Sequence, residues 1–335
     1  MKYILLILIS IGMVSCHEEV PELKALSGNA FGTTYTIQYF SETSLDAAKG
    51  VDSVIYSVNK SVSTYIPNSD ISKINRGDTT VVVDAIFKEV YRVSELVHNN
   101  SKGFFDPTVG VLRNAYGFGE EEPLQYIDSL TLDSLRRYVG FKKVKITSEG
   151  VVQKKYPEIY FDFNAVAKGY GIDLIGRYLE DHGVEHYLIE LGGELLAKGI
   201  NLSKDKPWVA GVESIDSELG NRTISALVTL QDKAMAASGN YRKFRIDETT
   251  GKKYVHTINP HTGKAQESNV TSATVIAPTC VLADAYATAF MAMGFNNAES
   301  LADYLKDIEV YLTYIDEDNN PQVFLTEGFQ KLLLP

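Results

Sequence analysis

The spacing of apolar and polar residues predicts both strands and helices in the first half of the chain. Residues 33–40 (TTYTIQYF) alternate with a period of two, which is typical of a half-buried strand. Apolar residues recur every three or four positions over residues 44–62, with Ser44 as the cap, and again over residues 85–99, so we predict two amphipathic helices. Residues 79–84 (TTVVVD) are rich in β-branched side chains and indicate a strand between these helices.

The second half of the chain alternates strands and helices less regularly. A strand at residues 158–163 leads into a helix of about four turns that ends at Gly183, and a later strand is broken by Gly192 and Gly193. Other predicted elements are strands within 223–237, 252–258 and 269–278, a turn at 238–240, and a peripheral part at 120–160 with a short helix near 132–139 and two strands. This irregular order predicts an α+β fold with antiparallel sheets. The length of 335 residues suits one large domain or two closely packed lobes.

The first residues have the pattern of an export signal. Lys2 precedes an apolar run, and small residues lead to a cysteine (MKYILLILISIGMVSC). We therefore predict a signal peptide over residues 1–15, lipidation of Cys16, a lipidated tether over residues 16–26, and one domain over residues 27–335. The protein would be exported and lipid-anchored to the membrane, facing the periplasm. The alternative is an ordinary cleaved signal peptide.

The charge and the cysteine content of the chain argue against a nucleic-acid partner and against an intrachain disulfide. The chain has 32 Lys and Arg against 43 Asp and Glu, a formal net charge of −11, and it has no basic stripe that could displace phosphate counterions. We therefore predict no nucleic-acid partner. Cys16 and Cys280 are the only cysteines, so no intrachain disulfide can form if Cys16 carries lipid.

One carboxylate stands in an otherwise apolar helix, PTCVLADAYATAFMAMG at residues 278–294. Thr279 could cap this helix and Gly294 could end it. Asp284 and Thr288 are four residues apart, so a helix places both oxygens on one face, where a hard cation such as Mg²⁺ could bind. The alternative is that Asp284 interacts with the helix dipole or bonds a neighbouring loop.

Two further segments carry candidate phosphate-binding and proton-transfer groups. Asp162 and Lys168 lie where a predicted strand end opens into a helix, a common place to hold a phosphate. A helix cap and a solvated lysine are the alternatives. His256 lies just before a turn and could act as a base or contact a phosphate, although a lone histidine is often only structural.

Aromatic residues could cover a ring system. Phe104 or Phe105 could do so, with Asp106 holding a polar edge, although such a pair often belongs to the core while the aspartate begins a turn. Tyr65 lies beside a polar loop and is equally ambiguous. The sequence has no P-loop, no dinucleotide-binding glycine motif, no CxxC or HExxH and no GxSxG elbow.

Eight blocks of sequence occur in an order that resembles the FAD:protein FMN transferase family, the ApbE family. They run from about Phe31 to Gly294 and are FGTTY, STYIPNSDISKIN, GFFDPTVGVLRNAYGFG, DFNAVAKGYGID, LIELGGELLAKG, AASGNYRKF, HTINPHTGK and VTSATVIAPTCVLADAYATAFMAMG. The resemblance implies a tunnelling-fold-like domain, with FAD as substrate in a cleft between the lobes and Mg²⁺ at the diphosphate. It implies transfer of FMN from FAD to a Thr or Ser hydroxyl of an acceptor protein, with release of AMP.

The resemblance also implies roles for individual residues. Asp284, Thr288 and the main-chain carbonyl of Ala165 match metal ligands. The positions that match FAD contacts are Phe31 (where Met is usual), Tyr65, Phe104, Phe105, Asp106, Asp162, Lys168 and Ile258. His256 and Asp284 are the candidate catalytic residues, and we favour His256 as the proton acceptor because a metal-bound carboxylate is a weak base.

Acceptor proteins implied by the resemblance are FMN-carrying subunits of membrane redox pumps and small FMN-binding domains outside the cytoplasm. Two other functions remain open at this point. A periplasmic FAD pyrophosphatase would use water in place of the acceptor and give FMN and AMP. A non-catalytic FAD-binding lipoprotein would bind FAD without releasing AMP.

Overall fold

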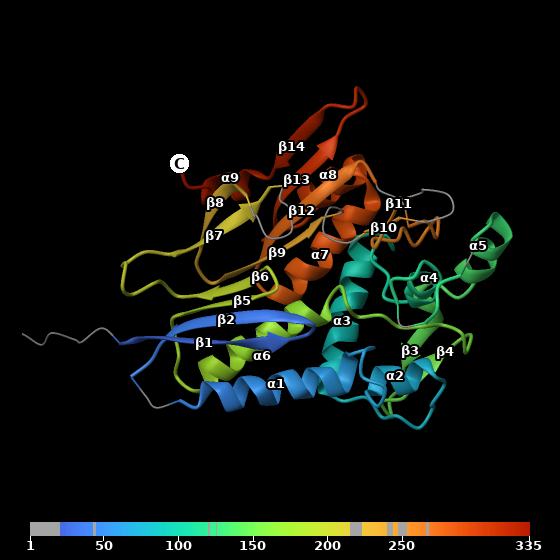
Figure 1. Ribbon diagram of the computed structural model, residues 1–335, viewed down its shortest axis with the longest axis horizontal. Coiled ribbons are helices and arrows are strands. Elements are labelled where there is room, and N and C mark those ends of the chain that lie inside the picture. The colour runs from blue at the N-terminus through green and yellow to red at the C-terminus, as the bar shows by residue number, and fades with distance from the viewer. Residues whose placement is uncertain are drawn as a thin grey trace, which may run out of the picture.

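The computed structural model describes residues 21–42, 45–119, 121–124, 126–214, 223–239, 244–246, 253–265 and 268–335 (Figure 1). Its main feature is an eight-stranded sheet in which each strand runs antiparallel to its neighbours. In sheet order the strands are β1 (Leu23–Ala30), β2 (Thr33–Phe40), β5 (Tyr187–Leu191), β6 (Glu194–Lys198), β9 (Lys233–Gly239), β12 (Val270–Ala277), β13 (Glu309–Ile315) and β14 (Pro321–Leu325). The predicted α+β class with antiparallel sheets is confirmed.

The remaining elements surround this sheet and form a smaller lobe beside it. The helices are α1 (Ala47–Val62), α2 (Asp70–Asn75), α3 (Ala85–Asn100), α4 (Gly110–Ala115), α5 (Ser129–Arg136), α6 (Ala167–Asp181), α7 (Cys280–Met293), α8 (Phe295–Tyr304) and α9 (Glu327–Leu332), with a 3₁₀ turn η1 (Phe141–Lys143). Three two-stranded sheets are β3 (Val144–Ile146) with β4 (Val152–Lys154), β7 (Trp208–Glu213) with β8 (Ile224–Leu230), and β10 (Phe244–Ile246) with β11 (Lys253–Val255). In Figure 1 the smaller lobe, with α2, α4, α5, β3 and β4, lies beyond α3.

Both faces of the sheet are buried, because apolar side chains along its strands point alternately into a core on either side. Along β12, Val275 and Ala277 belong to the large core with α3 and α7, whereas Ile276 belongs to the core on the other face. That second core also contains Trp208 of β7 and Phe329 of α9. The sheet is therefore a central layer with α6 and α7 on one side and β7, β8 and α9 on the other.

Helix α7 packs against β9 and β12 of the sheet and against α6, and twelve of its 14 residues are buried. Thr279 precedes the helix as predicted, but its side chain makes no capping bond. The carboxylate of Asp173 in α6 instead accepts hydrogen bonds from the backbone N–H groups of Cys280 and Val281, at 2.7 and 2.9 Å. The N-terminus of α7 is therefore capped by another helix, which fixes α6 against α7.

Two predicted strands do not form in the described residues, because other partners satisfy their backbone groups. Residues 79–84 contribute only an isolated bridge, Val82 to Val151. In the segment 158–163, the amide side chain of Asn75 bonds both the N–H and the C=O of Phe161, each at 2.8 Å. An amide side chain thus takes the place of a neighbouring strand.

Several predicted boundaries also shift. Strand β1 begins at Leu23, so the predicted tether at residues 16–26 overlaps the sheet by four residues. Helix α1 begins at Ala47 with Asp46 as the cap; Ser44 lies outside the described residues. Residues 238 and 239 continue β9 in place of the predicted turn.

Near the site, Gly192 and Gly193 form the tight turn between β5 and β6, with φ of +61° and +101°. A Cβ on Gly192 would also lie 2.6 Å from the Thr33 side chain. The turn itself thus packs closely against the start of β2. Among the described residues, no helix is long and apolar enough to cross a membrane.

Candidate functional site

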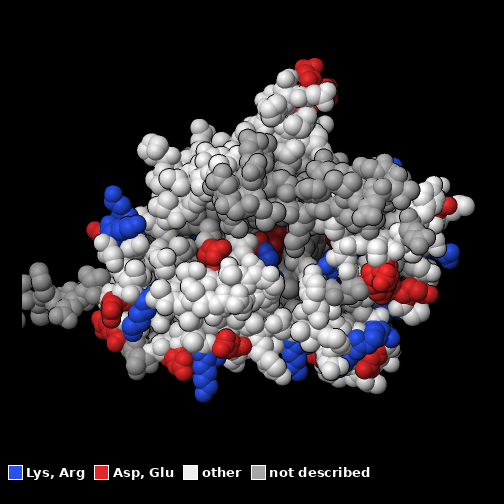
Figure 2. Space-filling model, in the orientation of Figure 1, with Lys and Arg blue, Asp and Glu red and all other residues white. Residues whose placement is uncertain are grey.

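A cavity of about 480 Å³ opens where the main sheet, α6, α7 and the smaller lobe meet. Twelve of the residues predicted to form the site line this cavity: Phe31, Tyr65, Phe104, Phe105, Asp106, Asp162, Ala165, Lys168, His256, Ile258, Asp284 and Thr288. Cys16 lies outside the described residues. In the space-filling view, basic and acidic atoms are visible together in a hollow near the centre of the face (Figure 2). The fold therefore brings the predicted residues together, while their individual roles stay predictions.

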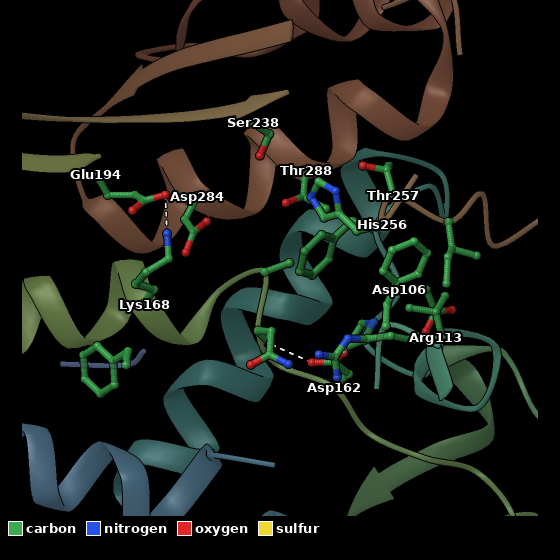
Figure 3. A pocket seen from close by; sticks show the side chains of 18 of the residues that line it. Asp106, Arg113, Asp162, Lys168, Glu194, Ser238, His256, Thr257, Asp284 and Thr288 are labelled. Atoms are coloured by element: carbon green, nitrogen blue, oxygen red, sulfur yellow. Dashed lines mark hydrogen bonds and ion pairs between the residues drawn. The ribbon is translucent and has the colours of Figure 1, made fainter. Parts of the chain in front are cut away.

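One end of the cavity holds a cluster of buried charges (Figure 3). Lys168 of α6 forms an ion pair with Glu194, whose side chain is 4% exposed at the start of β6. Asp284 of α7 is 5% exposed and accepts a hydrogen bond of 3.0 Å from the backbone N–H of Gly169. A Cβ on Gly169 would lie 2.4 Å from the carbonyl oxygen of Cys280, so only glycine lets α6 approach α7 this closely.

The charged groups in this cluster shift one another's pKa values. Burial alone would lower the pKa of Lys168, but the carboxylates of Asp284 and Glu194 outweigh it and raise that pKa above its ordinary value. Burial raises the pKa of Asp284, while Lys168 and the N–H of Gly169 act in the opposite direction. Two buried carboxylates thus share one ammonium group, and the cluster favours one further positive charge.

The donor atoms at this end fit a hard divalent cation. Asp284 and Thr288 are one turn apart on α7, and Ala165 precedes α6 in the same cavity wall. A carboxylate, a hydroxyl and a carbonyl are all oxygen ligands of the kind Mg²⁺ prefers. In the part of the chain that the structure describes, no group of three or more His, Cys, Asp or Glu side chains could hold a metal ion. A cation here would therefore depend on these mixed oxygen donors.

The other end of the cavity is organised around an arginine that the sequence analysis did not single out. The Nε atom of Arg113 in α4 lies 3.1 Å from the Oδ2 atom of Asp162, and its Nη2 atom donates a hydrogen bond of 2.9 Å to the Tyr65 hydroxyl. The Oδ1 atom of Asp162 accepts a hydrogen bond of 2.8 Å from the Asn164 N–H. In Figure 3, Arg113 and Asp162 lie on the opposite side of the cavity from Lys168 and Glu194.

Asp106 and its neighbours are largely structural. The Oδ1 atom of Asp106 accepts hydrogen bonds from the N–H and hydroxyl of Thr108, at 2.8 and 2.6 Å, and Oδ2 accepts one from the Phe141 N–H at 2.9 Å. This is the turn-forming arrangement that the sequence left open as an alternative. Phe105 is 3% exposed and belongs to the large core, whereas Phe104 packs edge-on against His261 with ring centroids 4.6 Å apart. Phe104 is therefore better placed than Phe105 to cover a bound ring system.

His256 follows the short strand β11 and lines the cavity together with Thr257 and Ile258. Ser238 at the end of β9 lines the same wall. Figure 3 shows His256 between the two charged ends, on the side where Thr288 points inward. A histidine in this place can exchange protons with a ligand that spans both ends.

Comparison with known proteins identifies the family. The sequence model of the ApbE family matches residues 31–312 of the chain. The chain belongs to the ApbE family. It is 31% identical to an FAD:protein FMN transferase of Vibrio cholerae, with 99% of each chain covered. It is 30% identical to that of Haemophilus influenzae, with 98% of this chain and 96% of the relative covered.

Solved structures of ApbE proteins have the same fold. The flavin transferase ApbE from Vibrio cholerae superimposes with a TM-score of 0.82 at 30% identity, covering 93% of this chain and 100% of that one. The apo form of the Pseudomonas stutzeri flavinyl transferase ApbE gives 0.81 at 26% identity, covering 93% and 97%. The resemblance of the eight sequence blocks to this family is thereby confirmed.

Arg113, Asn164 and Glu194 line the same cavity but were not among the site residues predicted from the sequence. Glu194 follows the Gly192–Gly193 break and could have been noticed as an acid after a tight turn. Arg113 lies in the block GFFDPTVGVLRNAYGFG, where nothing in the sequence distinguishes it from a solvated arginine. Its importance comes from its partners in other parts of the chain.

Proposed function

We propose that this protein transfers FMN from FAD to a Thr or Ser hydroxyl of an acceptor protein and releases AMP. The observation that carries the proposal is the division of the cavity into two ends. Lys168 and the oxygens of Ala165, Asp284 and Thr288 at one end suit a diphosphate with its cation. The aromatic rings and polar side chains at the other end suit a planar ring.

Ala165, Asp284 and Thr288 would hold a divalent cation, most simply Mg²⁺. When bound, such a cation withdraws charge from the diphosphate and stabilises the departing phosphate. Lys168 neutralises a phosphate oxygen from the α6 side, and Glu194 holds the lysine in place. Phe104 and Tyr65 cover the ring system at the opposite end.

The transfer step forms one bond and breaks one. The hydroxyl oxygen of the acceptor bonds to the phosphorus of the FMN half, while the bond from that phosphorus to the bridging oxygen breaks and AMP leaves with the electron pair. His256 takes the proton from the attacking hydroxyl. The acceptor candidates are FMN-carrying subunits of membrane redox pumps and small FMN-binding domains.

The test is incubation of the protein with FAD and Mg²⁺, with and without an FMN-binding acceptor domain. Mass spectrometry follows the acceptor and chromatography follows the free nucleotides. We expect the acceptor to gain the mass of FMN, and this gain to be lost with EDTA and in Asp284→Ala. Asp303→Ala, which removes an exposed acid from α8, is the matched control and should retain the activity.

Other outcomes would assign a different activity. Free FMN and AMP with an unmodified acceptor would indicate a pyrophosphatase. Bound but intact FAD would indicate a flavin-binding lipoprotein. A full transfer rate in Asp284→Ala would exclude the assignment of this carboxylate.

We also propose that the protein is exported and anchored to the membrane through lipid on Cys16, facing the periplasm. The support is the sequence of residues 1–16, with its apolar run ending in small residues before the cysteine. Cys16→Ser should abolish the incorporation of a labelled fatty acid into the protein. Incorporation into this variant would contradict the anchor.

A further inference from the structure

Arg113 makes two directed contacts with one guanidinium group at the cavity wall. Its side chain is 14% exposed, and its Nε and Nη2 atoms point to two residues that are distant in sequence, Asp162 and Tyr65. The contacts are 3.1 and 2.9 Å long. A planar guanidinium has donors in fixed directions, so these two contacts also fix the partners relative to each other.

Tyr65 is the more informative partner, because it is 57% exposed and yet held in place. Its hydroxyl accepts the hydrogen bond from Arg113, and the guanidinium carbon lies 5.8 Å from the centre of its ring. An exposed tyrosine usually samples several rotamers. Fixing it before a ligand arrives reduces the entropy that is lost when a planar ring stacks on it.

Asp162 connects the same arginine to the loop before α6. One carboxylate oxygen is paired with Arg113, and the other accepts the Asn164 N–H at 2.8 Å. Asn164 precedes Ala165, whose carbonyl is a proposed cation ligand. Arg113 therefore joins the aromatic rim of the cavity to the loop that leads to the cation end.

We infer that Arg113 is a positioning residue for the flavin nucleotide. The arginine orients Tyr65 and Asp162 so that they can contact the part of the substrate that carries the ring. This inference rests on the proposed binding of FAD. Arg113 acts through its neighbours and takes no part in the transfer of the phosphoryl group. A lysine would keep the charge beside Asp162 but has no planar fork to hold both partners.

The experiment measures the Kd of FAD by quenching of flavin fluorescence, and kcat and KM of transfer, in four variants. Arg113→Met should raise the Kd and KM for FAD about tenfold or more, because losing the orientation of Tyr65 and Asp162 costs binding free energy on the order of one charge-assisted hydrogen bond. The kcat should change by less than about threefold, because Arg113 takes no part in the transfer step. Arg113→Lys should not restore binding.

Tyr65→Phe provides a test at an exposed site that does not disturb folding. It removes only the hydroxyl and should raise the Kd several-fold. In the double variant of Arg113→Met and Tyr65→Phe, the Kd should rise no further than in Arg113→Met alone, because the arginine acts on the ring through that hydroxyl.

Arg177→Met is the matched control. Arg177 also pairs with a carboxylate, Glu89, at 2.8 Å and lies 5.7 Å from the ring centre of a tyrosine, Tyr170, but it does not line the cavity. Its replacement should leave the Kd of FAD unchanged even if the melting temperature falls.

Three results would overturn the inference: an unchanged Kd in Tyr65→Phe, full rescue by Arg113→Lys, or independent effects in the double variant. If Arg113→Met does not fold, the result for Tyr65→Phe still decides. Failure of the unmodified protein to bind FAD would instead overturn the proposed function. The two failures are therefore distinguishable.

Discussion

The side chain of Asp284 is so deeply buried that an isolated carboxylate there would destabilise the folded protein by several kcal/mol. Lys168 offsets this cost, but Lys168 is also the ion-pair partner of Glu194, which is itself buried. One ammonium group therefore balances two carboxylates, and the Gly169 N–H supplies the remaining polar contact of Asp284. A bound cation would complete this balance, which is why the cluster suits the phosphate end of the cavity.

Lys168→Met tests this balance of charges. We expect kcat/KM for FAD to fall by about tenfold or more, because hydrogen bonds to charged groups contribute about 1.5–3 kcal/mol. The variant should also melt at a lower temperature, since Glu194 and Asp284 lose their common counter-charge. Mg²⁺ should then raise its melting temperature more than it raises that of the unmodified protein, as measured by circular dichroism.

Lys204→Met, at an exposed position outside the cavity, is the control for Lys168→Met and should respond to Mg²⁺ like the unmodified protein. Equal Mg²⁺-induced shifts in all three proteins would contradict the sharing of one lysine by two carboxylates.

At the scale of elements, the site depends on the packing of α6 against α7. Two contacts fix the helices: the Asp173 carboxylate on the N–H groups of Cys280 and Val281, and the Gly169 N–H on Asp284. Both contacts require the helices to approach closely within the first two turns of α6 and of α7. The packing therefore places Lys168 and Asp284 at the same end of the cavity.

Gly169→Ala should disturb this packing. The new Cβ would lie 2.4 Å from the backbone oxygen of Cys280 and 2.9 Å from the Cβ of Asp284, so one helix must shift. We expect a loss of about 1–3 kcal/mol in the free energy of unfolding, the usual cost of overpacking, measured by urea denaturation. Gly171→Ala is the comparison, because its Cβ would meet only the Phe31 ring at 2.6 Å, and a side chain can rotate away. Equal losses in both variants would show that backbone approach is not the constraint.

Asp173 gives α7 a pH-dependent cap. Burial raises the pKa of Asp173 to about 6 in the folded protein, against its ordinary 3.8, although the N–H groups of Val281 and Cys280 act in the opposite direction. The folded state therefore holds this proton more tightly than the unfolded chain does. The contribution of Asp173 to the free energy of unfolding is therefore fully present below about pH 4 and is lost as the pH rises through about 6.

Comparison with Asp173→Asn isolates this contribution. The stability of the unmodified protein relative to the variant should decrease between about pH 4 and 6, by roughly 3 kcal/mol at most. Urea denaturation at a series of pH values measures the difference. A difference that stays constant, or grows with pH, would refute the raised pKa.

The same elements show what local sequence can and cannot predict. The strand at residues 33–40 and the helix near residues 85–99 form as predicted, because one face of each is buried and the periodicity records that burial. The predicted strand at 158–163 fails because Asn75, far away in the chain, bonds the peptide groups of Phe161. No local pattern encodes such a contact.

At the scale of the whole molecule, the cavity draws residues from nearly the full length of the chain, from Phe31 to Thr288. Asp284 could be singled out in the sequence because it contrasts with an apolar helix. Arg113 could not, because its partners Tyr65 and Asp162 are separated from it by 48 and 49 positions. The family resemblance supplied the grouping of the site residues, which periodicity and spacing alone did not.

Because the cavity exists only in the folded chain, its ligands should stabilise the whole molecule. FAD at 100 times its Kd should add about 2.7 kcal/mol to the free energy of unfolding. We expect the melting temperature to rise by several degrees with FAD and Mg²⁺ together, and by less with EDTA. Asp284→Ala should show the smaller rise in both conditions, since it lacks the carboxylate ligand, whereas Asp303→Ala should behave like the unmodified protein. Thermal unfolding across a series of FAD concentrations measures this without any transfer reaction. A full Mg²⁺-dependent rise in Asp284→Ala would place the cation elsewhere, even if that variant were inactive.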